Sequence, residues 1–301
     1  MGGSFRGGAS VFRGGTSGGA TLNYRHHFHA GNFADLIKHA ILLTLLERMT
    51  AEPGPILVLD THAGAGVYDL QGAEAQKSRE AEAGIGRLMA DAQAPAAFAS
   101  LKAAVDGLNG GEPLRLYPGS PALVLPSLRP GDRFLACELR ADDYAACAAL
   151  MSEKKPAGAK CEALRTDGFA MVAKAALRPE PRALVLVDPP YERNDDYKRA
   201  LTSAKSLIQG KAGAVLAIWT PLKDLDTFDR FLSGLESLHP RAGYVAQVRL
   251  RPLTDPMRMN GCAVAVVGEA GSAAEAKAAA DWIVARVGDP GGEARVTALR
   301  S

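Results

Sequence analysis

The 301-residue sequence predicts an α/β fold in which a mostly parallel sheet is covered by helices on both faces. Short apolar runs of strand length alternate with longer segments of helical periodicity, which is the pattern of consecutive βαβ units. Two later apolar runs, at 244–251 and 261–267, are separated only by a loop and indicate an antiparallel pair at one edge of the sheet. An alanine-rich stretch at about 69–112 predicts a small inserted helical subdomain.

The composition is that of an ordinary globular protein, with 47% hydrophobic and 23% charged residues. The formal net charge of +2 is compatible with a polyanionic partner but does not by itself indicate one. The four cysteines lack C-x-x-C spacing, so we expect buried thiols in a reducing compartment. No run reaches the roughly 18 apolar residues of a membrane span, and no signal peptide is visible. We therefore expect a cytoplasmic protein without a membrane segment.

The chain begins with a glycine-rich leader that also carries serine and arginine. Such a composition cannot bury enough surface to offset the entropy lost on ordering. We expect residues 1–22 to be disordered and residues 23–301 to form one domain.

A helix and a strand follow the leader. Asn32 can cap a helix, and Asp35 lies in its first turn, where the helix dipole favours an acid. The helical pattern covers 33–49 and stops at the sequence EPGP. The first strand, ILVLD at 56–60, opens into the loop THAGAG.

Four further strands, each followed by a helix, continue the alternation. We predict strands at 133–138, 160–165, 183–188 and 213–219, and helices at 141–152, 167–177, 194–208 and 222–235.

The segment 69–112 interrupts this alternation. It contains two helical patterns, at 78–92 and 95–109, with no strand between them. An insertion of this kind can cap a pocket, can meet a macromolecular partner, or can be purely structural.

Acidic side chains end or directly follow four strands of the predicted sheet: Asp60, Glu138, Asp167 and Asp188. Because the carboxyl ends of parallel strands meet at one edge, where ligands bind, these acids should lie together. Taken singly, each could be a helix cap or a solvated loop residue. Four at successive strand ends favour a binding site.

The loop after the first strand allows close approach of a ligand at Gly64, but it lacks the third glycine of the dinucleotide fingerprint. Asp60 beside it would repel a pyrophosphate. S-adenosylmethionine, which carries a sulfonium and an ammonium group and no phosphate, fits better. Glu138 then suits a ribose diol, and Asp167 suits an adenine amino group.

The motif Asp188, Pro189, Pro190, Tyr191 has a chemical explanation. The two prolines end the strand pairing and hold an extended turn with outward carbonyls. An exocyclic amino group of a base can then donate its hydrogens to Asp188 and to the Pro189 carbonyl, which directs its lone pair at a methyl group. Tyr191 offers a face to a base extruded from its stack. The motif predicts amino methylation; a plain surface turn is the alternative.

Together with these motifs, the blocks YRHHFHAGNFADLIKH, LDTHAGAG, YPGSP, CEL and TDGF closely resemble the RlmJ-type methyltransferases, from about Asn23 to about Val267. These enzymes methylate the N6 of one adenine in bacterial 23S ribosomal RNA. The resemblance implies a Rossmann-like class I methyltransferase fold, S-adenosylmethionine as cofactor, and 23S ribosomal RNA as partner. We expect a monomer that acts before the subunit is fully assembled.

The resemblance also implies roles for individual residues. These are Lys38, His39, His62 and Ser120 around the methionine end of the cofactor, Glu138, Asp167 and Gly168 at ribose and adenine, Asp188 as the catalytic acid beside the cofactor, and Tyr24 in a tail near the substrate. Tyr24 and His26 suit RNA, since one can stack on a base and the other can donate a hydrogen bond.

Three other functions remain open at this level. The Asp-Pro-Pro-Tyr motif reports an amino acceptor, so DNA adenine or another amine is an alternative substrate. Five histidines could suggest a metal hydrolase, although no H-E-x-x-H helix is present and we expect no metal: His26, His27, His29, His39 and His62. A non-enzymatic binding module would not require the strand-end acids and the Pro-Pro turn together.

Overall fold

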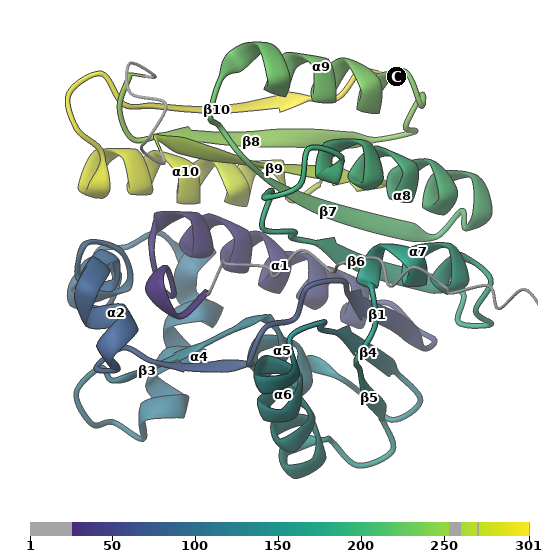
Figure 1. The fold of residues 1–301 in the computed structure, drawn as a ribbon, viewed down its shortest axis with the longest axis horizontal. Coiled ribbons are helices and arrows are strands. Elements are labelled where there is room, and N and C mark those ends of the chain that lie inside the picture. The colour runs from purple at the N-terminus through teal and green to yellow at the C-terminus, as the bar shows by residue number, and fades with distance from the viewer. Residues whose placement is uncertain (1–25, 253–259, 270, 301) are drawn as a thin grey trace, which may run out of the picture.

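The computed structural model describes residues 26–252, 260–269 and 271–300, and the predicted leader and Tyr24 lie outside them. An eight-stranded sheet has the order β10-β8-β9-β7-β6-β1-β4-β5 (Figure 1). Its parallel strands are β1 (Ile56–Asp60), β4 (Arg133–Cys137), β5 (Lys160–Leu164), β6 (Arg182–Val187) and β7 (Ala214–Pro221). This arrangement confirms the predicted mostly parallel α/β fold.

The antiparallel part of the sheet differs from the prediction in one respect. Strand β9 (Gly261–Val267) pairs with both β7 and β8 (Gly243–Arg249), so the expected antiparallel pair is present. A further strand, β10 (Glu293–Ala298), pairs with β8 and forms the edge. The expectation that the β8–β9 pair lies at the edge was therefore wrong, because the chain returns to the sheet after helix α10 (Ala273–Val287).

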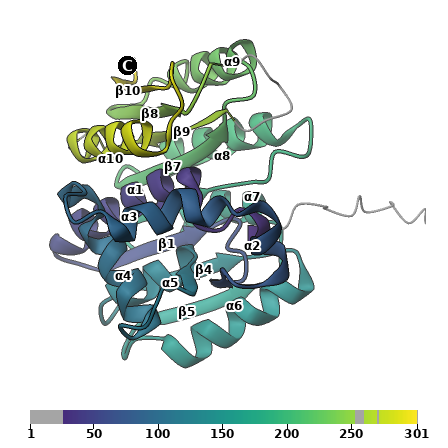
Figure 2. The ribbon, with the colours of Figure 1, turned by 90° about the vertical axis from the view of Figure 1, so that its left-hand side faces the viewer.

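Helices cover both faces of the sheet (Figures 1 and 2). One core receives side chains from α1 (Phe33–Ala51), α5 (Ser120–Val124), α6 (Ala141–Lys154) and α10. The other receives them from α7 (Gly168–Ala176), α8 (Asp196–Gly210) and α9 (Leu225–Glu236). Along β1 the side chains alternate between the two cores, which explains its unbroken apolar sequence.

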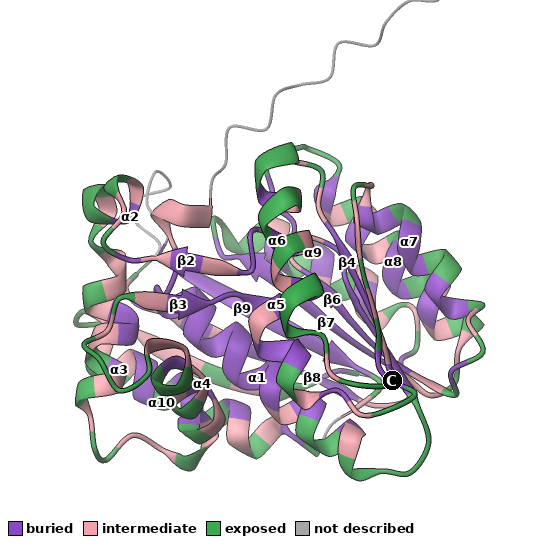
Figure 3. Ribbon diagram, turned by 90° about the horizontal axis from the view of Figure 1, so that it is seen from below, coloured by how far each residue is buried: buried purple, intermediate pink, exposed green. Residues whose placement is uncertain are grey.

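Helix α1 is buried along most of its length, as the colouring in Figure 3 shows. Its sequence is apolar on nearly every side because it packs against the sheet, α10 and the insertion. Asn32 caps it as predicted, since its side-chain oxygen accepts from the amides of Ala34 and Asp35. A short 3₁₀ turn, η1 (His26–Phe28), precedes the cap, and a second, η4 (Leu125–Ser127), follows α5.

The segment between Asp69 and Leu116 contains the predicted helices and is flanked by two short strands that were not predicted. Strands β2 (Val67–Asp69) and β3 (Leu116–Pro118) pair with each other outside the main sheet. Between them lie α2 (Ala73–Ser78), the π-helical turn η2 (Glu82–Gly86), α3 (Arg87–Ala90), η3 (Ala96–Phe98) and α4 (Ala99–Asn109). The helix predicted at 78–92 begins only after Arg79, whose positive φ of 55° ends α2, a short helix that was not predicted.

The insertion rests on the C-terminal part of the chain (Figure 2). The rings of Phe98 and Trp282 lie 5.2 Å apart, and Trp282 Nε1 donates to Asp91 at 2.9 Å. Among the described residues, no helix is both long and apolar enough to cross a bilayer.

Candidate active site

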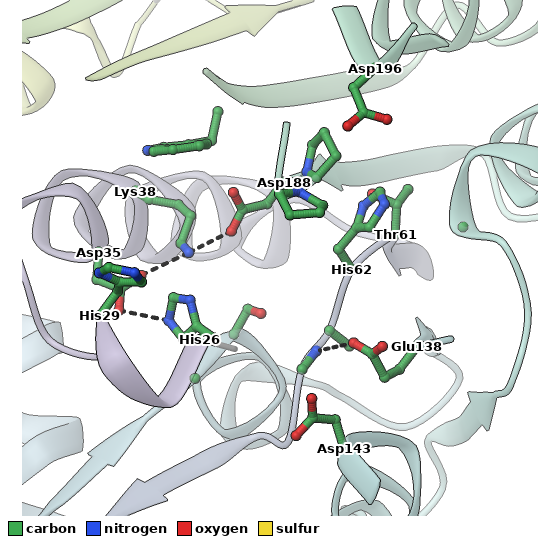
Figure 4. A pocket seen from close by; sticks show the side chains of 18 of the residues that line it. His26, His29, Asp35, Lys38, Thr61, His62, Glu138, Asp143, Asp188 and Asp196 are labelled. Atoms are coloured by element: carbon green, nitrogen blue, oxygen red, sulfur yellow. Dashed lines mark hydrogen bonds and ion pairs between the residues drawn. The ribbon is translucent and has the colours of Figure 1, made fainter. Parts of the chain in front are cut away.

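A pocket opens where the parallel strands end at their carboxyl edge, beside the N-terminal part of α1 (Figure 4). Of the site residues predicted from sequence and described by the structure, all but Tyr191 line it. They are His26, Lys38, His39, His62, Gly64, Ser120, Glu138, Asp167, Gly168, Asp188 and Pro189.

Glu138 is held by the glycine loop across the pocket. Its carboxylate accepts from the amides of Gly64 at 3.0 Å and Arg140 at 2.7 Å. Burial raises the pKa of Glu138, and these two N–H groups oppose that effect. Gly64 has a φ of +62°, and a side chain there would meet the Tyr68 hydroxyl at 2.1 Å. The loop therefore requires glycine at this point.

Asp167 is both a helix cap and a pocket residue. It accepts from the amide of Phe169 at 3.1 Å at the start of α7, and it forms an ion pair with Arg199. The Arg199 guanidinium lies 4.4 Å from the centre of the Phe169 ring. At Gly168 a Cβ would come within 2.0 Å of the Thr61 carbonyl, so the strand-end loops touch here. Arg199 was not predicted, because nothing in its local sequence sets it apart on α8.

The hydrogen bonds of His62 assign its tautomer. The Thr61 hydroxyl donates to the Leu186 carbonyl at 3.0 Å, so it must accept from Nδ1 of His62 at 2.8 Å. Burial lowers the pKa of His62 to about 4, and the ring is therefore neutral near pH 7. Its Nε2 is an acceptor on a residue that lines the pocket.

Asp60 and Ser120 form a buried pair at the end of β1. The Ser120 hydroxyl donates to Asp60 at 2.5 Å, and the His62 amide donates to the same carboxylate at 3.1 Å. Burial raises the pKa of Asp60 to about 6, with a smaller contribution from the charge of Asp188. Asp60 is thus a hydrogen-bond acceptor that is protonated at a higher pH than an ordinary aspartate.

A buried chain of charges leads from the N-terminal turn to Asp188 (Figure 4). Lys38 Nζ lies 2.6 Å from Asp188 Oδ2 and 2.8 Å from Asp35 Oδ1. Asp35 also accepts from His26 Nε2 at 2.9 Å and from the Gly31 amide at 2.9 Å. Lys38 therefore joins two carboxylates, a contact that the sequence did not predict.

Within this chain of contacts, the charges of Lys38 and Asp35 are strongly favoured. Burial alone would lower the pKa of Lys38, but the carboxylates of Asp188 and Asp35 outweigh burial and raise that pKa well above its ordinary value. Burial alone would raise the pKa of Asp35, but His26 and Lys38 hold it well below its usual range. The spacing of Asp35 and Lys38, three residues apart on one helix, could have revealed their pairing.

His39 lies beside this chain but does not join it. Its Nδ1 is 2.8 Å from the Tyr117 hydroxyl, and the two rings stack with centroids 5.6 Å apart. Burial lowers the pKa of His39 to about 3. The ring is therefore a neutral wall of the pocket.

The aromatic face expected at Tyr191 is not offered to the pocket, which corrects the prediction made from its motif. Tyr191 is only 5% exposed, and its hydroxyl donates to the Trp219 carbonyl at 2.8 Å. Its ring packs against Tyr197 at a centroid distance of 4.5 Å. The backbone at Tyr191 has a φ of +50°, a conformation that is uncommon for a residue other than glycine. Trp219, which was not predicted, lines the pocket at the end of β7.

The histidines are engaged separately. His26 contacts Asp35, His29 contacts Glu80, His39 contacts Tyr117 and His62 contacts Thr61. Within the described ranges, no three histidine, cysteine or acidic side chains form a group that could hold a metal ion.

Comparisons with known proteins agree with one another. The family model described as "Ribosomal RNA large subunit methyltransferase D, RlmJ" matches residues 53–299. A protein from Haemophilus influenzae named Ribosomal RNA large subunit methyltransferase J is 37% identical over 248 residues, which cover 82% of this chain and 86% of the relative. Its namesake from Escherichia coli is 36% identical over 239 residues, covering 79% and 82%.

A solved structure has the same architecture. Protein LPL1258 from Legionella pneumophila superposes with a TM-score of 0.81 at 27% identity, over 89% of this chain and 98% of that one.

Proposed function

This chain belongs to the RlmJ family of ribosomal RNA large subunit methyltransferases, and from that membership we propose that it transfers a methyl group from S-adenosylmethionine to the exocyclic N6 of an adenine in 23S ribosomal RNA. One structural observation supports the proposal at the level of individual residues. Asp188 and Pro189 follow β6 and line the same pocket as the strand-end acids.

The chemistry of the lining fits this cofactor. The strand-end side chains that line the pocket include the acceptors Glu138 and Asp167, and such a lining suits hydroxyl, amino and ammonium groups and disfavours phosphate. When bound, S-adenosylmethionine supplies a methyl group on a positively charged sulfur.

We assign the cofactor contacts from the family resemblance, and the residue types present are compatible with them. Glu138 would hold the ribose hydroxyls, and Asp167 with Gly168 would hold the adenine. The methionine end would be held by His62, His39, Ser120 and Lys38, where Nε2 of His62 can accept from an ammonium group.

At the acceptor end, the roles follow from the position of Asp188. Its carboxylate and the Pro189 carbonyl would accept the two hydrogens of the target amino group and so orient the nitrogen lone pair. Lys38 Nζ pairs with this carboxylate at 2.6 Å. An adenine amine is too weak an acid to be deprotonated first, so Asp188 takes the proton as positive charge develops on nitrogen.

The recessed position of the acceptor site determines the form of RNA that can be used. Asp188 is 17% exposed, so a target base must leave its stack to reach it. Extrusion is easier in RNA that is not yet packed into a finished subunit. We therefore propose that the protein acts on 23S RNA before subunit assembly is complete. From the family resemblance alone, we propose that it does so as a monomer in the cytoplasm.

Methyl transfer from labelled S-adenosylmethionine to three acceptors in parallel tests this proposal. The acceptors are protein-free 23S RNA, intact large subunits and adenine-containing DNA. We expect incorporation into the free RNA, with little into subunits or DNA. Incorporation into DNA alone would replace the RNA assignment with the DNA alternative, which the Asp-Pro-Pro-Tyr motif does not exclude.

A further inference from the structure

The helical insertion touches the pocket wall that is formed by His26, His29 and Asn32. This wall lies on the acceptor side, because His26 connects through Asp35 and Lys38 to Asp188. The insertion occupies most of the chain between β2 and β3.

Glu80, between α2 and η2, makes the polar contact. A single oxygen of its carboxylate, Oε2, accepts from His29 Nδ1 at 3.0 Å and from Asn32 Nδ2 at 2.9 Å. The Glu80 side chain is 38% exposed and that of His29 is 33% exposed. An ion pair of this exposure contributes little to global stability. Its effect is local, because one oxygen ties together two residues of the same wall.

Backbone contacts reinforce this attachment. The Ile85 amide donates to the Gly31 carbonyl at 2.8 Å, and the Ser78 hydroxyl donates to the Phe28 carbonyl. Gly84 lies so close that a Cβ there would come within 2.1 Å of the Gly31 carbonyl oxygen. The insertion therefore contacts the backbone of the segment from Phe28 to Asn32.

From the segment that the insertion contacts, a continuous set of contacts leads to the acceptor site. The Asn32 side chain donates a hydrogen bond from its amide group to Glu80, and its oxygen accepts from the first backbone amides of α1. The next residues of that turn place Asp35, which holds Lys38 and His26. Lys38 then meets Asp188.

We propose that the helical insertion fixes the acceptor side of the active site, and that Glu80 is the positioning residue through which it acts. Glu80 itself does not line the pocket. Its removal should loosen the wall that faces the RNA and leave the ribose and adenine end of the cofactor site, built from the loops after β1, β4 and β5, in place. That this wall faces RNA rests on the proposed function.

Two substitutions and a matched control test the proposal. Glu80→Ala removes both hydrogen bonds, Glu80→Gln keeps an acceptor oxygen without the charge, and Glu82→Ala is the control. Glu82 belongs to the same insertion, but it is exposed and pairs only locally with Arg79. Hydrogen exchange of residues 28–38 gives a readout that needs no RNA. We expect Glu80→Ala to speed exchange there by about tenfold, with Glu80→Gln intermediate and Glu82→Ala unchanged.

Kinetics provide the second readout. In Glu80→Ala we expect kcat/KM for 23S RNA to fall about tenfold, as for loss of one charge-assisted hydrogen bond, while the Kd for S-adenosylmethionine changes less than twofold. Glu80→Gln should recover part of the loss. Combining Glu80→Ala with His29→Ala should give less than the product of the single effects, since both remove the same contact.

The outcomes separate this inference from the proposed function. If Glu80→Ala lowers the melting temperature but leaves both local exchange and kcat/KM unchanged, the insertion is a structural appendage and the inference is wrong. If the wild-type protein methylates no RNA, the proposed function fails, and the exchange of residues 28–38 still decides whether Glu80 fixes the wall.

Discussion

The carboxylate of Asp188 lies between a buried cation and an open pocket. Lys38 occupies one side of it at 2.6 Å, so the charge remains compensated before any substrate enters. Burying an unpaired carboxylate would be strongly unfavourable, and the ion pair with Lys38 offsets that cost. Lys38 is therefore better explained as a partner of the acceptor carboxylate than as a cofactor ligand alone.

Asp188→Asn tests this role at the level of one atom. The amide keeps an oxygen acceptor but cannot take a proton and presents an amino group toward Lys38. We expect kcat to fall by more than about a hundredfold, within the range of general acid–base effects, with the fold and most cofactor affinity retained. Single-turnover methyl transfer measures it, and more than a tenth of wild-type turnover would contradict the role.

Glu138→Ala tests the cofactor end. The substitution removes a carboxylate that is already held in place by the Gly64 and Arg140 amides. We expect S-adenosylmethionine binding to weaken by about 1.5 to 3 kcal/mol, the usual contribution of hydrogen bonds to a charged group. Isothermal titration calorimetry gives the dissociation constant directly, and an unchanged value would remove Glu138 from the cofactor site.

At the scale of elements, the N-terminal turn η1 connects the outer segment of the chain to the site. We expect deletion of residues 1–20 to leave methylation nearly unchanged. Deletion of 1–27 should reduce it strongly, because this removes the His26 contact with Asp35 along with Tyr24. Cofactor affinity should survive both deletions, since the strand-end acids remain. Two truncations with the same activity, high or low, would show that residues 21–27 have no role in the substrate step.

Sequence reasoning located the elements whose signals are local. Strand β1 was placed correctly because a buried parallel strand is a short apolar run, here between EPGP and THAGAG. Strand β10 was missed because only one face of it is covered and its sequence, EARVTA, carries little apolar signal. Strands β2 and β3, with three residues each, are too short for any periodicity to appear.

At the candidate active site too, features with a local sequence signal were predicted, and features that depend on distant residues were not. The strand-end acids were found because a parallel sheet gathers its carboxyl ends at one edge. The link between Lys38 and Asp188 joins residues 150 positions apart, and no local pattern reports it. The burial of Tyr191 depends on contacts with Trp219 and Tyr197, which the letters Asp-Pro-Pro-Tyr do not specify.

For the whole molecule, the buried histidines couple stability to pH. The folded pKa values of His39 and His62, about 3 and about 4, lie below the ordinary value of 6.5. The unfolded chain therefore binds protons first as the pH falls below 6.5, and the free energy of unfolding decreases until the folded pKa values are reached. Each histidine contributes on the order of 3 kcal/mol across that range. Asp60, with a folded pKa of about 6, acts in the opposite direction and offsets part of the loss.

Denaturant unfolding at several values between pH 7 and pH 4 measures this dependence. We expect stability to fall over that interval, and His39→Gln to flatten the curve. His239→Asn is the control, because this histidine is exposed and its positive φ of 49° suits asparagine. The control should leave the slope unchanged. A wild-type free energy of unfolding that is constant from pH 6.5 to pH 4 would contradict the neutral buried state of these rings.

The central claim is that one pocket brings a methyl donor to the amino group of a ribosomal RNA adenine held by Asp188. Nucleoside mass spectrometry of protein-free 23S RNA, treated with S-adenosylmethionine and either the wild-type protein or Asp188→Asn, tests it most directly. The account predicts a single N6-methyladenosine per RNA molecule with the wild-type protein and none with the variant. Methylation at another atom or another base, or equal N6-methyladenosine with both proteins, would contradict it.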